Sequence, residues 1–386
     1  MTKPYWLPIA IALLLFVGAI VNNYTFGFAW VDIWLTAILV LIAIAFSRVD
    51  RRQTVSPPKL EGQAYVRILL SVAVGAAVSH YAQAGVPLLS DDPNVARMEF
   101  MASSVAFKVL KVFVPFLIIY LVATLALQKK HRAENSIFTV ILLILQLFSG
   151  GKGAALWGGV FVILGLNVAG VRLPVGKFIL GAMIVAIPTV VLFKIVAGLD
   201  TWTETFELLL LRFTGIAEYG LYATVNLVRD DLRFFDPLLF VPDLFDKLTS
   251  SNPPPYTLSF GRRVTGILYD DDPYVFLWEL TVTAPADIYT LVGGWIYPFA
   301  IIVYMSIFSW IGSLASRTRQ LFLKTSAYVI LYHLGLYVLT GSLMAEFFVR
   351  TVPFFVFSLG GWGVYCWAFR QRHGQIAEKV AANEVV

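Results

Sequence analysis

The chain has 386 residues, of which 59% are hydrophobic and only 14% are charged. Soluble domains carry about 25% charged residues, so the composition excludes an ordinary soluble protein and indicates an integral membrane protein. The net charge of +5 does not indicate nucleic-acid binding, because Lys and Arg in a membrane protein mostly record which side each loop occupies. We therefore expect membrane lipids, and no nucleic acid, among the partners. The single cysteine, Cys366, excludes an internal disulfide bond.

A membrane-spanning helix needs roughly 20 mostly apolar residues. Ten segments approach this pattern, and no signal-peptide cleavage pattern follows the first, which is therefore expected to stay as a helix. The fold expected is all-α, a polytopic membrane protein of about ten transmembrane helices. The expected spans are about 5–22, 28–47, 65–86, 104–127, 136–150, 153–170, 177–198, 288–312, 325–347 and 351–369.

The basic residues between these spans alternate from one connection to the next. Clusters of Lys and Arg follow every second span, as in "KKHR" (129–132), "SRTRQLFLK" (316–324) and "RQRHGQIAEK" (370–379). Short loops rich in Lys and Arg face the cytoplasm. The pattern thus predicts that both termini, including the tail 370–386, are cytoplasmic.

The opposite, outer side carries one long segment, 199–287, between the seven spans of 1–198 and the three of 288–369. Its first part, about 203–229, repeats apolar residues at helical spacing and predicts an amphipathic helix that lies along the membrane interface or packs on the bundle. The remainder is rich in Pro, Gly, Ser and Asp, which is typical of irregular loops.

Several basic residues lie on the outer side, against the usual bias. Snorkelling of a side chain to the interface explains any one of them, but not Arg212 beside four leucines or the "GRR" turn. A group of cations at one level suits a multiply charged anion, since Arg and Lys both bind phosphate oxygens. The candidate ligands of a lipid diphosphate are Arg212, Lys108, Lys111, Lys152, Arg262 and Arg263.

A carboxylate or histidine near such a cluster is a candidate general base. The candidates are Glu218, Glu279, Asp287 and His80, the last being the only histidine near the outer face. His333, inside a span, is interpreted instead as a hydrogen-bonded helix contact. No set of His, Cys and carboxylates has metal-ligand spacing, and no nucleotide fingerprint is present. We therefore expect neither a metal nor another cofactor.

With these features the chain resembles the bacterial oligosaccharide repeat-unit polymerases, the O-antigen and exopolysaccharide polymerases of the Wzy type, which are distant relatives of the O-antigen ligases. "LLLLRFTGIAEYG" looks like the helix that opens the large periplasmic loop of this family. "PYTLSFGRRVTGILY" and "TVTAPADIYTLVGGWIYPFAIIVYM" look like the end of that loop and its return to the membrane. "FSGGKGAALWGG" looks like the family's Ser-Arg-Gly turn, with Lys152 in place of the more usual Arg.

The resemblance implies a GT-C-like glycosyltransferase of the bacterial inner membrane, with 199–287 in the periplasm. The donor would be a glycan on undecaprenyl diphosphate, and the acceptor a repeat unit on the same carrier. A chain-length regulator is a further partner that the resemblance allows. The loop lacks the histidine of the ligase relatives, which favours polymerase over ligase and leaves the general base unassigned. Two alternatives stay open, an O-antigen ligase acting on a lipid A core and a transporter of lipid-linked sugars.

Overall fold

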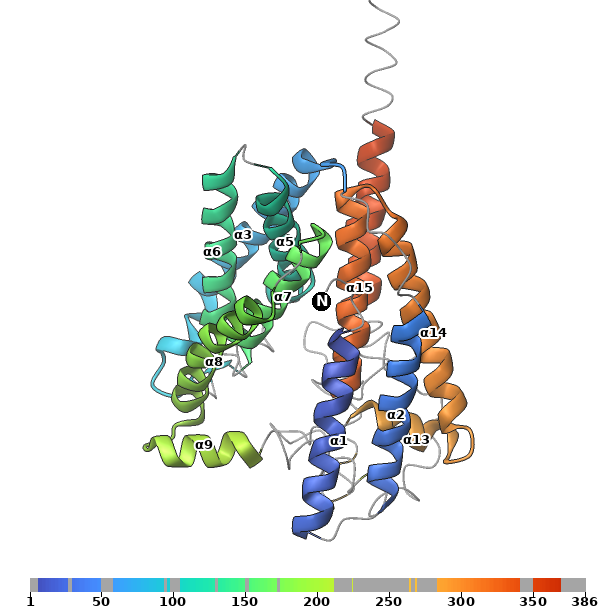
Figure 1. Cartoon of the computed structure of the whole chain (residues 1–386). Helices are drawn as coiled ribbons and strands as arrows, with labels where there is room; N and C mark the ends of the chain where they lie inside the picture. Colours follow the sequence, from blue (N-terminus) through green and yellow to red (C-terminus); the bar gives the residue numbers. More distant parts are fainter. Residues whose placement is uncertain are drawn as a thin grey trace, which may run out of the picture.

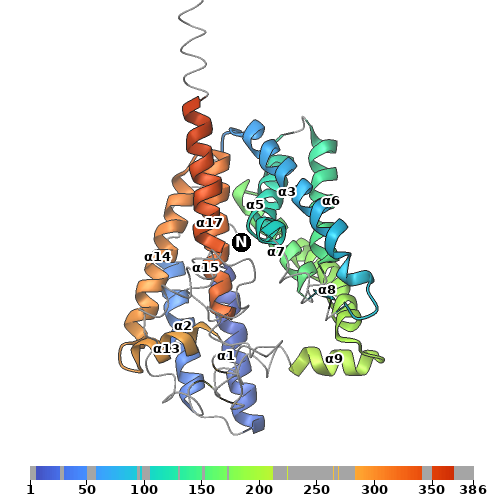
Figure 2. The ribbon, with the colours of Figure 1, turned by 180° about the vertical axis from the view of Figure 1, so that it is seen from behind.

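The protein is helical throughout the part that the structure describes. The computed structural model describes residues 6–26, 30–49, 58–93, 96–97, 105–128, 131–149, 153–171, 174–211, 224, 264, 268, 283–340 and 350–368. No β-strand occurs in these ranges, apart from an isolated bridge between Lys59 and Gln320. Figures 1 and 2 show the helices from opposite sides. In chain order they are α1 (Trp6–Phe26), α2 (Trp30–Val49), α3 (Gln63–Ala84), η1 (Pro87–Leu89), α5 (Val105–Leu127), α6 (Arg132–Phe148), α7 (Ala154–Val168), α8 (Val175–Ala197), α9 (Trp202–Leu211), α13 (Ala284–Val292), α14 (Tyr297–Arg317), α15 (Leu321–Thr340), α17 (Val352–Phe354) and η5 (Phe355–Gly360).

The long helices have the apolar character of membrane spans. Among the described residues, five are long and apolar enough to cross a membrane, namely those within Gln63–Leu89, Leu110–Leu127, Leu180–Ala197, Tyr297–Arg317 and Leu321–Val338. Four shorter apolar segments accompany them, at Pro8–Val21, Ile33–Ser47, Ala154–Val168 and Val352–Ala368. The expectation of an all-helical membrane protein is confirmed at this level.

The connections that the basic residues assigned to one side lie at one end of the bundle. The backbone N–H of Lys59, before α3, donates to the carbonyl of Arg319 at 2.5 Å, and the N–H of Leu321 donates to the Lys59 carbonyl at 3.0 Å. This links the α2–α3 connection to the α14–α15 connection. At the same end, Tyr120 of α5 donates to the carbonyl of Glu61 at 3.0 Å.

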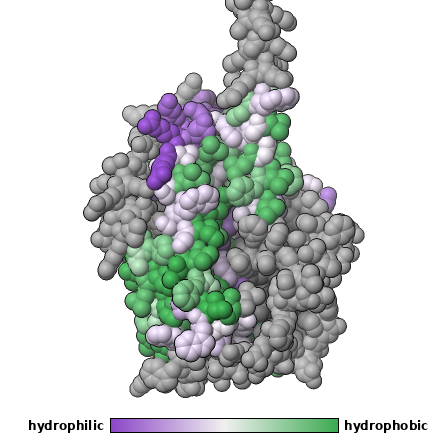
Figure 3. All heavy atoms as spheres, turned by 90° about the vertical axis from the view of Figure 1, so that its right-hand side faces the viewer, coloured by the Kyte–Doolittle hydropathy of each residue, from purple (hydrophilic) through white to green (hydrophobic). Residues whose placement is uncertain are grey.

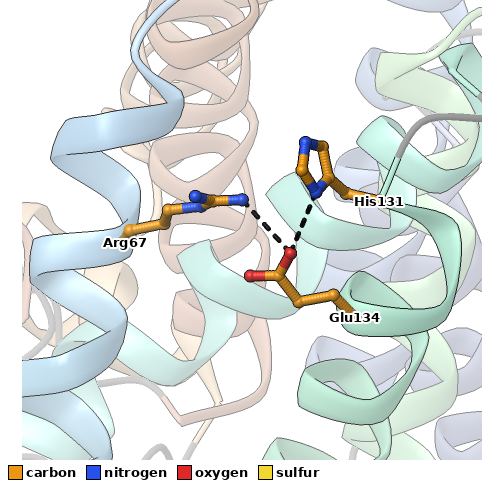
Figure 4. A network of polar contacts seen from close by, with 3 residues as sticks. All are labelled: Arg67, His131 and Glu134. Atoms are coloured by element: carbon orange, nitrogen blue, oxygen red, sulfur yellow. Dashed lines mark hydrogen bonds and ion pairs between the residues drawn. The ribbon is translucent and has the colours of Figure 1, made fainter.

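A side-chain contact joins a third connection to this end. Glu134, in the first turn of α6, places Oε2 3.2 Å from Nη2 of Arg67 and 3.1 Å from Nδ1 of His131 (Figure 4). All three side chains are partly exposed, so the pairs contribute at most about 1 kcal/mol. Figure 3 shows hydrophilic residues gathered at the upper end and a hydrophobic surface below them.

The opposite end carries the two helices that run across the bundle. In both ribbon views α9 and α13 lie crosswise, at the lower end (Figures 1 and 2). Along α9, Trp202, Phe206 and Leu210 are exposed, and their spacing of four residues places them on one stripe. This agrees with an interfacial amphipathic helix over the residues described, while 212–223 of the predicted helix lie outside them.

Two spans form the centre of the bundle. Most of α5 and α15 is buried, whereas α8 is mostly exposed. A helix that is hydrophobic all round belongs in a core, and α5 is buried without interruption from Val112 to Thr124. The ring of Phe116 on α5 contacts Phe322 of α15 at 5.1 Å between centroids. These two helices therefore form the framework for any buried site.

The predicted span 288–312 is divided in the structure. α13 ends at Gly293, whose φ of 77° is a left-handed conformation that glycine adopts without strain, and α14 begins only at Tyr297 with a proline at its first turn. The apolar run is continuous in the sequence, so hydropathy alone could not separate the two helices.

The last predicted span, 351–369, contains an irregular stretch. Residues Phe355–Gly360 form a π-helix. The hydroxyl of Tyr65, on α3, donates to the Phe357 carbonyl at 2.8 Å, so a side chain inserts where the regular hydrogen-bond ladder is broken. Such insertions are an ordinary cause of local departures from an α-helix.

Candidate functional site

The predicted base candidate Asp287 lies in a buried polar pair. It is in the first turn of α13 and only 7% exposed. The hydroxyl of Tyr337 on α15, itself fully buried, donates to Oδ2 of Asp287 at 3.2 Å. The ring of Tyr304 on α14 packs against Tyr337, with 5.7 Å between centroids. The carboxylate is thus held by hydrogen bonding where three helices meet.

His333 lies one helical turn before Tyr337 on α15 and is also buried. Only one of its two ring nitrogens contacts a hydrogen-bonding group in the described part of the chain. Its Nδ1 lies 3.3 Å from the hydroxyl of Thr351, just before α17. Its Nε2 is buried and has no hydrogen-bond partner among the residues that the structure describes. The ring of Phe354 stands edge-on to the imidazole, 6.2 Å away between centroids. His333 and Tyr337 are four residues apart, so they lie on the same face of α15.

Two cations lie close enough to this histidine for their charges to act on its ring. Arg350, which is partly buried, has the stronger influence, and the exposed Lys111 the weaker one. Lys111 is on α5, and Arg350 immediately precedes Thr351. Phe354 contacts Phe116 of α5, with 5.6 Å between ring centroids, so α5, α15 and the start of α17 pack together at this level.

We call this set the His333 site: His333 and Tyr337 from α15, Asp287 from α13, Lys111 from α5, and Arg350 with Thr351. It combines two cations, a buried carboxylate and an imidazole with one open nitrogen. Cations from separate elements can bind a phosphorylated group, and the imidazole or carboxylate can exchange a proton. The start of α13 adds Thr283, a fully buried residue whose hydroxyl has no hydrogen-bond partner in the described ranges.

The structure brings together only part of the predicted site. Lys111 and Asp287 both contribute to the His333 site. Lys108 lies on α5, with its side chain outside the described part. His80 is 1% exposed on α3, where its ring lies 6.3 Å from that of Tyr81. The remaining predicted residues lie outside the described ranges; these are Arg212, Glu218, Lys152, Arg262, Arg263 and Glu279.

Four members of the His333 site were not predicted from the sequence, namely His333, Tyr337, Arg350 and Thr351. His333 was interpreted as a hydrogen-bonded helix contact, which its Nδ1 makes with Thr351, whereas the lack of a partner for Nε2 among the described residues was not foreseen. Arg350 lies in a short connection that the charge pattern assigns to the outer side, and this offered a signal because a basic residue there opposes the topology bias. Tyr337 carried no signal, since tyrosine is common in apolar helices and its role depends on α13.

Lys194, near the C-terminal end of α8, makes contacts within its own segment of the chain. Its Nζ donates to the carbonyl oxygens of Leu199 and Asp200, at 2.5 and 2.8 Å, and lies 5.6 Å from the centre of the Trp202 ring. It closes the C-terminal end of α8, where a cation is favourable. Its interactions are thus structural.

Comparison with known proteins identifies no relative. No protein-family model, characterised protein or solved structure matches the chain. The functional assignment therefore depends on the chemistry of the chain itself.

Proposed function

We propose that this protein is a membrane glycosyltransferase that polymerises oligosaccharide repeat units carried on undecaprenyl diphosphate, at the periplasmic face of a bacterial inner membrane. The observation that carries the proposal is the convergence of Lys111 and Arg350, from different elements, on a buried imidazole beside the Asp287–Tyr337 pair. A lipid diphosphate is the multiply charged anion that reaches this depth in a membrane protein.

The chemistry requires stabilisation of the departing diphosphate. A hydroxyl of the acceptor sugar attacks the anomeric carbon of the donor, and undecaprenyl diphosphate leaves with the electron pair of the broken bond. Fixed cations stabilise the charge that develops on the leaving group, an effect worth about 3–4 kcal/mol for a single well-placed donor. Lys111 and Arg350 supply such charges, and we assign the same role to Arg212, Lys108, Lys152, Arg262 and Arg263.

The proposed orientation follows from the alternation of basic residues. The end that carries Lys59 and Arg319 would face the cytoplasm, and the end with α9 and α13 the periplasm. α5 enters from the outer end and α15 leaves toward it, so Lys111 and His333 lie in the outer half of the bundle. This is the side on which a flipped lipid-linked glycan is presented.

Turnover by the purified protein tests the proposal. The protein is reconstituted with a lipid-linked repeat unit, and the products are separated by chain length. A ladder of products supports polymerisation, whereas a single addition to a lipid A core added as competitor would indicate a ligase. Absence of any glycan transfer, with the protein monodisperse in detergent, contradicts the assignment.

A pair of lysine variants links the activity to the His333 site. Lys111→Gln is expected to lower the rate by roughly 30- to 1,000-fold, because one charge on the leaving group is lost. Lys194→Gln is the matched control, since its lysine bonds to backbone carbonyls at the end of α8. It should lower the thermal midpoint rather than the rate. Equal losses of rate in the two variants would remove Lys111 from the diphosphate site.

A further inference from the structure

The open nitrogen of His333 is a feature that stability does not explain. Within the described part of the chain, Nε2 is buried without a hydrogen-bond partner, and an unsatisfied buried polar group costs about 1–3 kcal/mol. Buried polar groups are nearly always paired, and a native exception calls for a specific reason, catalysis among them. A phenylalanine or leucine would fill an apolar helix contact without this cost.

The ring itself is held in a defined position. The contact of Nδ1 with the Thr351 hydroxyl fixes one edge, and the ring of Phe354 stands against one side. An imidazole oriented through one nitrogen, with the other nitrogen open, is the arrangement that proton-transferring histidines require. Asp287, the other base candidate of the site, already accepts a hydrogen bond from Tyr337.

We propose that Nε2 of His333 is the group that accepts the proton from the attacking hydroxyl of the acceptor sugar. This inference rests on the proposed glycosyltransferase function and assigns the general base that the sequence left open. The Thr351 hydroxyl can accept a hydrogen bond from Nδ1–H, and in that tautomer the lone pair of Nε2 is available.

The step balances with no further reactant. The O–H bond of the acceptor breaks as its oxygen bonds to the anomeric carbon, and the proton moves to Nε2. The bond between the anomeric carbon and the phosphate oxygen breaks, and undecaprenyl diphosphate leaves with that electron pair. The imidazolium then returns its proton to water or to the departing diphosphate.

The surrounding charges couple this proton transfer to binding of the donor. Two cations, Lys111 and Arg350, act on the ring. A third positive charge, on the imidazole, is therefore unfavourable when no diphosphate is bound. A bound diphosphate neutralises them and stabilises the imidazolium. The other ionisable groups of the site are Asp287 and Tyr337, on the next turn. The base is therefore effective chiefly when the donor is in place.

Reaching the nitrogen requires a local change of structure. Because Nε2 is buried, the acceptor hydroxyl contacts it only after neighbouring side chains move. This predicts that donor binding precedes acceptor binding.

Replacement of His333 by glutamine tests the assignment. Glutamine keeps a polar side chain of similar reach but cannot accept the proton. His333→Gln should lower kcat by about 100- to 10,000-fold, while the affinity for undecaprenyl diphosphate, measured by isothermal calorimetry, changes less than about threefold. The rate of the wild type should fall at acid pH, because a protonated imidazole is no base, and the residual rate of the variant should lose that dependence. His131→Gln, at the opposite end of the bundle, is the matched control.

Other outcomes overturn the inference. The inference is wrong if the His333→Gln variant forms ladders at near wild-type rate. It is also wrong if the variant loses both rate and affinity for the diphosphate, since that result describes a binding residue. If the glutamine variant does not fold, Thr351→Val replaces it. This change keeps the imidazole but frees its orientation, and it should lower kcat with KM unchanged; an unaltered kcat contradicts the inference. Failure of the wild type to form any product contradicts the proposed function itself, and is distinguished by the absence of activity in every sample.

Discussion

The buried carboxylate of Asp287 illustrates what a single hydrogen bond does inside this bundle. A carboxylate away from water is costly unless it is hydrogen-bonded, and Tyr337 supplies one such bond at 3.2 Å. The same bond ties α13 to α15, two elements that are separated by the whole of α14. The pair thus positions the crosswise helix against the centre of the bundle.

A double-mutant cycle measures this pair. Tyr337→Phe removes only the hydroxyl and should lower the free energy of unfolding by about 1–3 kcal/mol, because Asp287 loses a buried partner. Asp287→Asn should also destabilise the protein. In the double variant the two losses should not add, with a coupling of about 0.5–3 kcal/mol. Additive shifts of the thermal midpoint in detergent would show that the two side chains do not interact.

Arg212 follows directly after the described end of α9, beside four leucines. If it binds the diphosphate, lysine cannot replace it fully, because lysine lacks the planar fork of donors. Arg212→Ala should lower the rate of polymerisation by roughly 30- to 1,000-fold at normal abundance, and Arg212→Lys should also lose a large part of it. If Arg212 only anchors a helix, lysine substitutes well and alanine lowers abundance first. Chain-length ladders together with immunoblots distinguish these results.

The packing of α7 on α5 depends on one small residue. A Cβ atom at Gly165 would lie 2.7 Å from Cβ of Val122 and 2.9 Å from the carbonyl oxygen of Ile119. Close approach of this kind is how helices associate in membranes, where small residues let backbones come together. Because the carbonyl oxygen belongs to the α5 backbone, it cannot move aside as a side chain could.

Gly165→Ala should therefore destabilise the bundle by about 1–3 kcal/mol through overpacking. Gly181→Ala is the matched control, because a Cβ there meets no atom within 4 Å on the exposed side of α8. Thermal unfolding in detergent should show a lower midpoint for the first variant only. Val122→Ala should not restore it, because the Cβ atom of residue 122 and the Ile119 carbonyl oxygen both remain in place. A midpoint unchanged by Gly165→Ala would contradict the close α5–α7 contact.

The arrangement of all the helices agrees with the alternation of charge along the chain. The α2–α3, α5–α6 and α14–α15 connections meet at one end through backbone and side-chain contacts. The crosswise helices α9 and α13 lie at the other end (Figure 1). Charge alternation and three-dimensional packing are independent properties, and both divide the connections in the same way.

Cysteine labelling tests which end faces the periplasm. In a Cys366→Ser background, Asp91→Cys and Arg319→Cys introduce thiols at exposed positions of the two ends. A membrane-impermeant maleimide, added to intact cells with a permeabilised outer membrane, should label Cys at 91 and leave Cys at 319 unlabelled until the inner membrane is opened. Ser250→Cys, in the long segment 199–287, should label like the first. The reverse pattern would place the His333 site in the cytoplasmic half.

The local hydropathy of the sequence was enough to predict where the long helices of this protein lie. Apolar runs of about 20 residues leave little alternative to a membrane helix, since every backbone group must be satisfied within the segment. Each of the ten expected ranges overlaps a helix within the described residues, and five of these helices are long and apolar enough to cross a membrane. The division between α13 and α14 was not predicted, because Gly293 and Gly294 interrupt a continuous apolar run without changing its hydropathy.

The site, in contrast, was only partly predictable. Lys111 and Asp287 were identified because a charge in or beside an apolar helix is expensive and conspicuous. Arg350, Thr351, Tyr337 and the open nitrogen of His333 acquire their roles from the packing of α5, α13, α15 and α17, segments that are more than 200 residues apart at the extremes. Which faces of these helices meet depends on steric fit between distant side chains. That information is distributed over the whole chain, so only the tertiary structure decides which polar groups share a site.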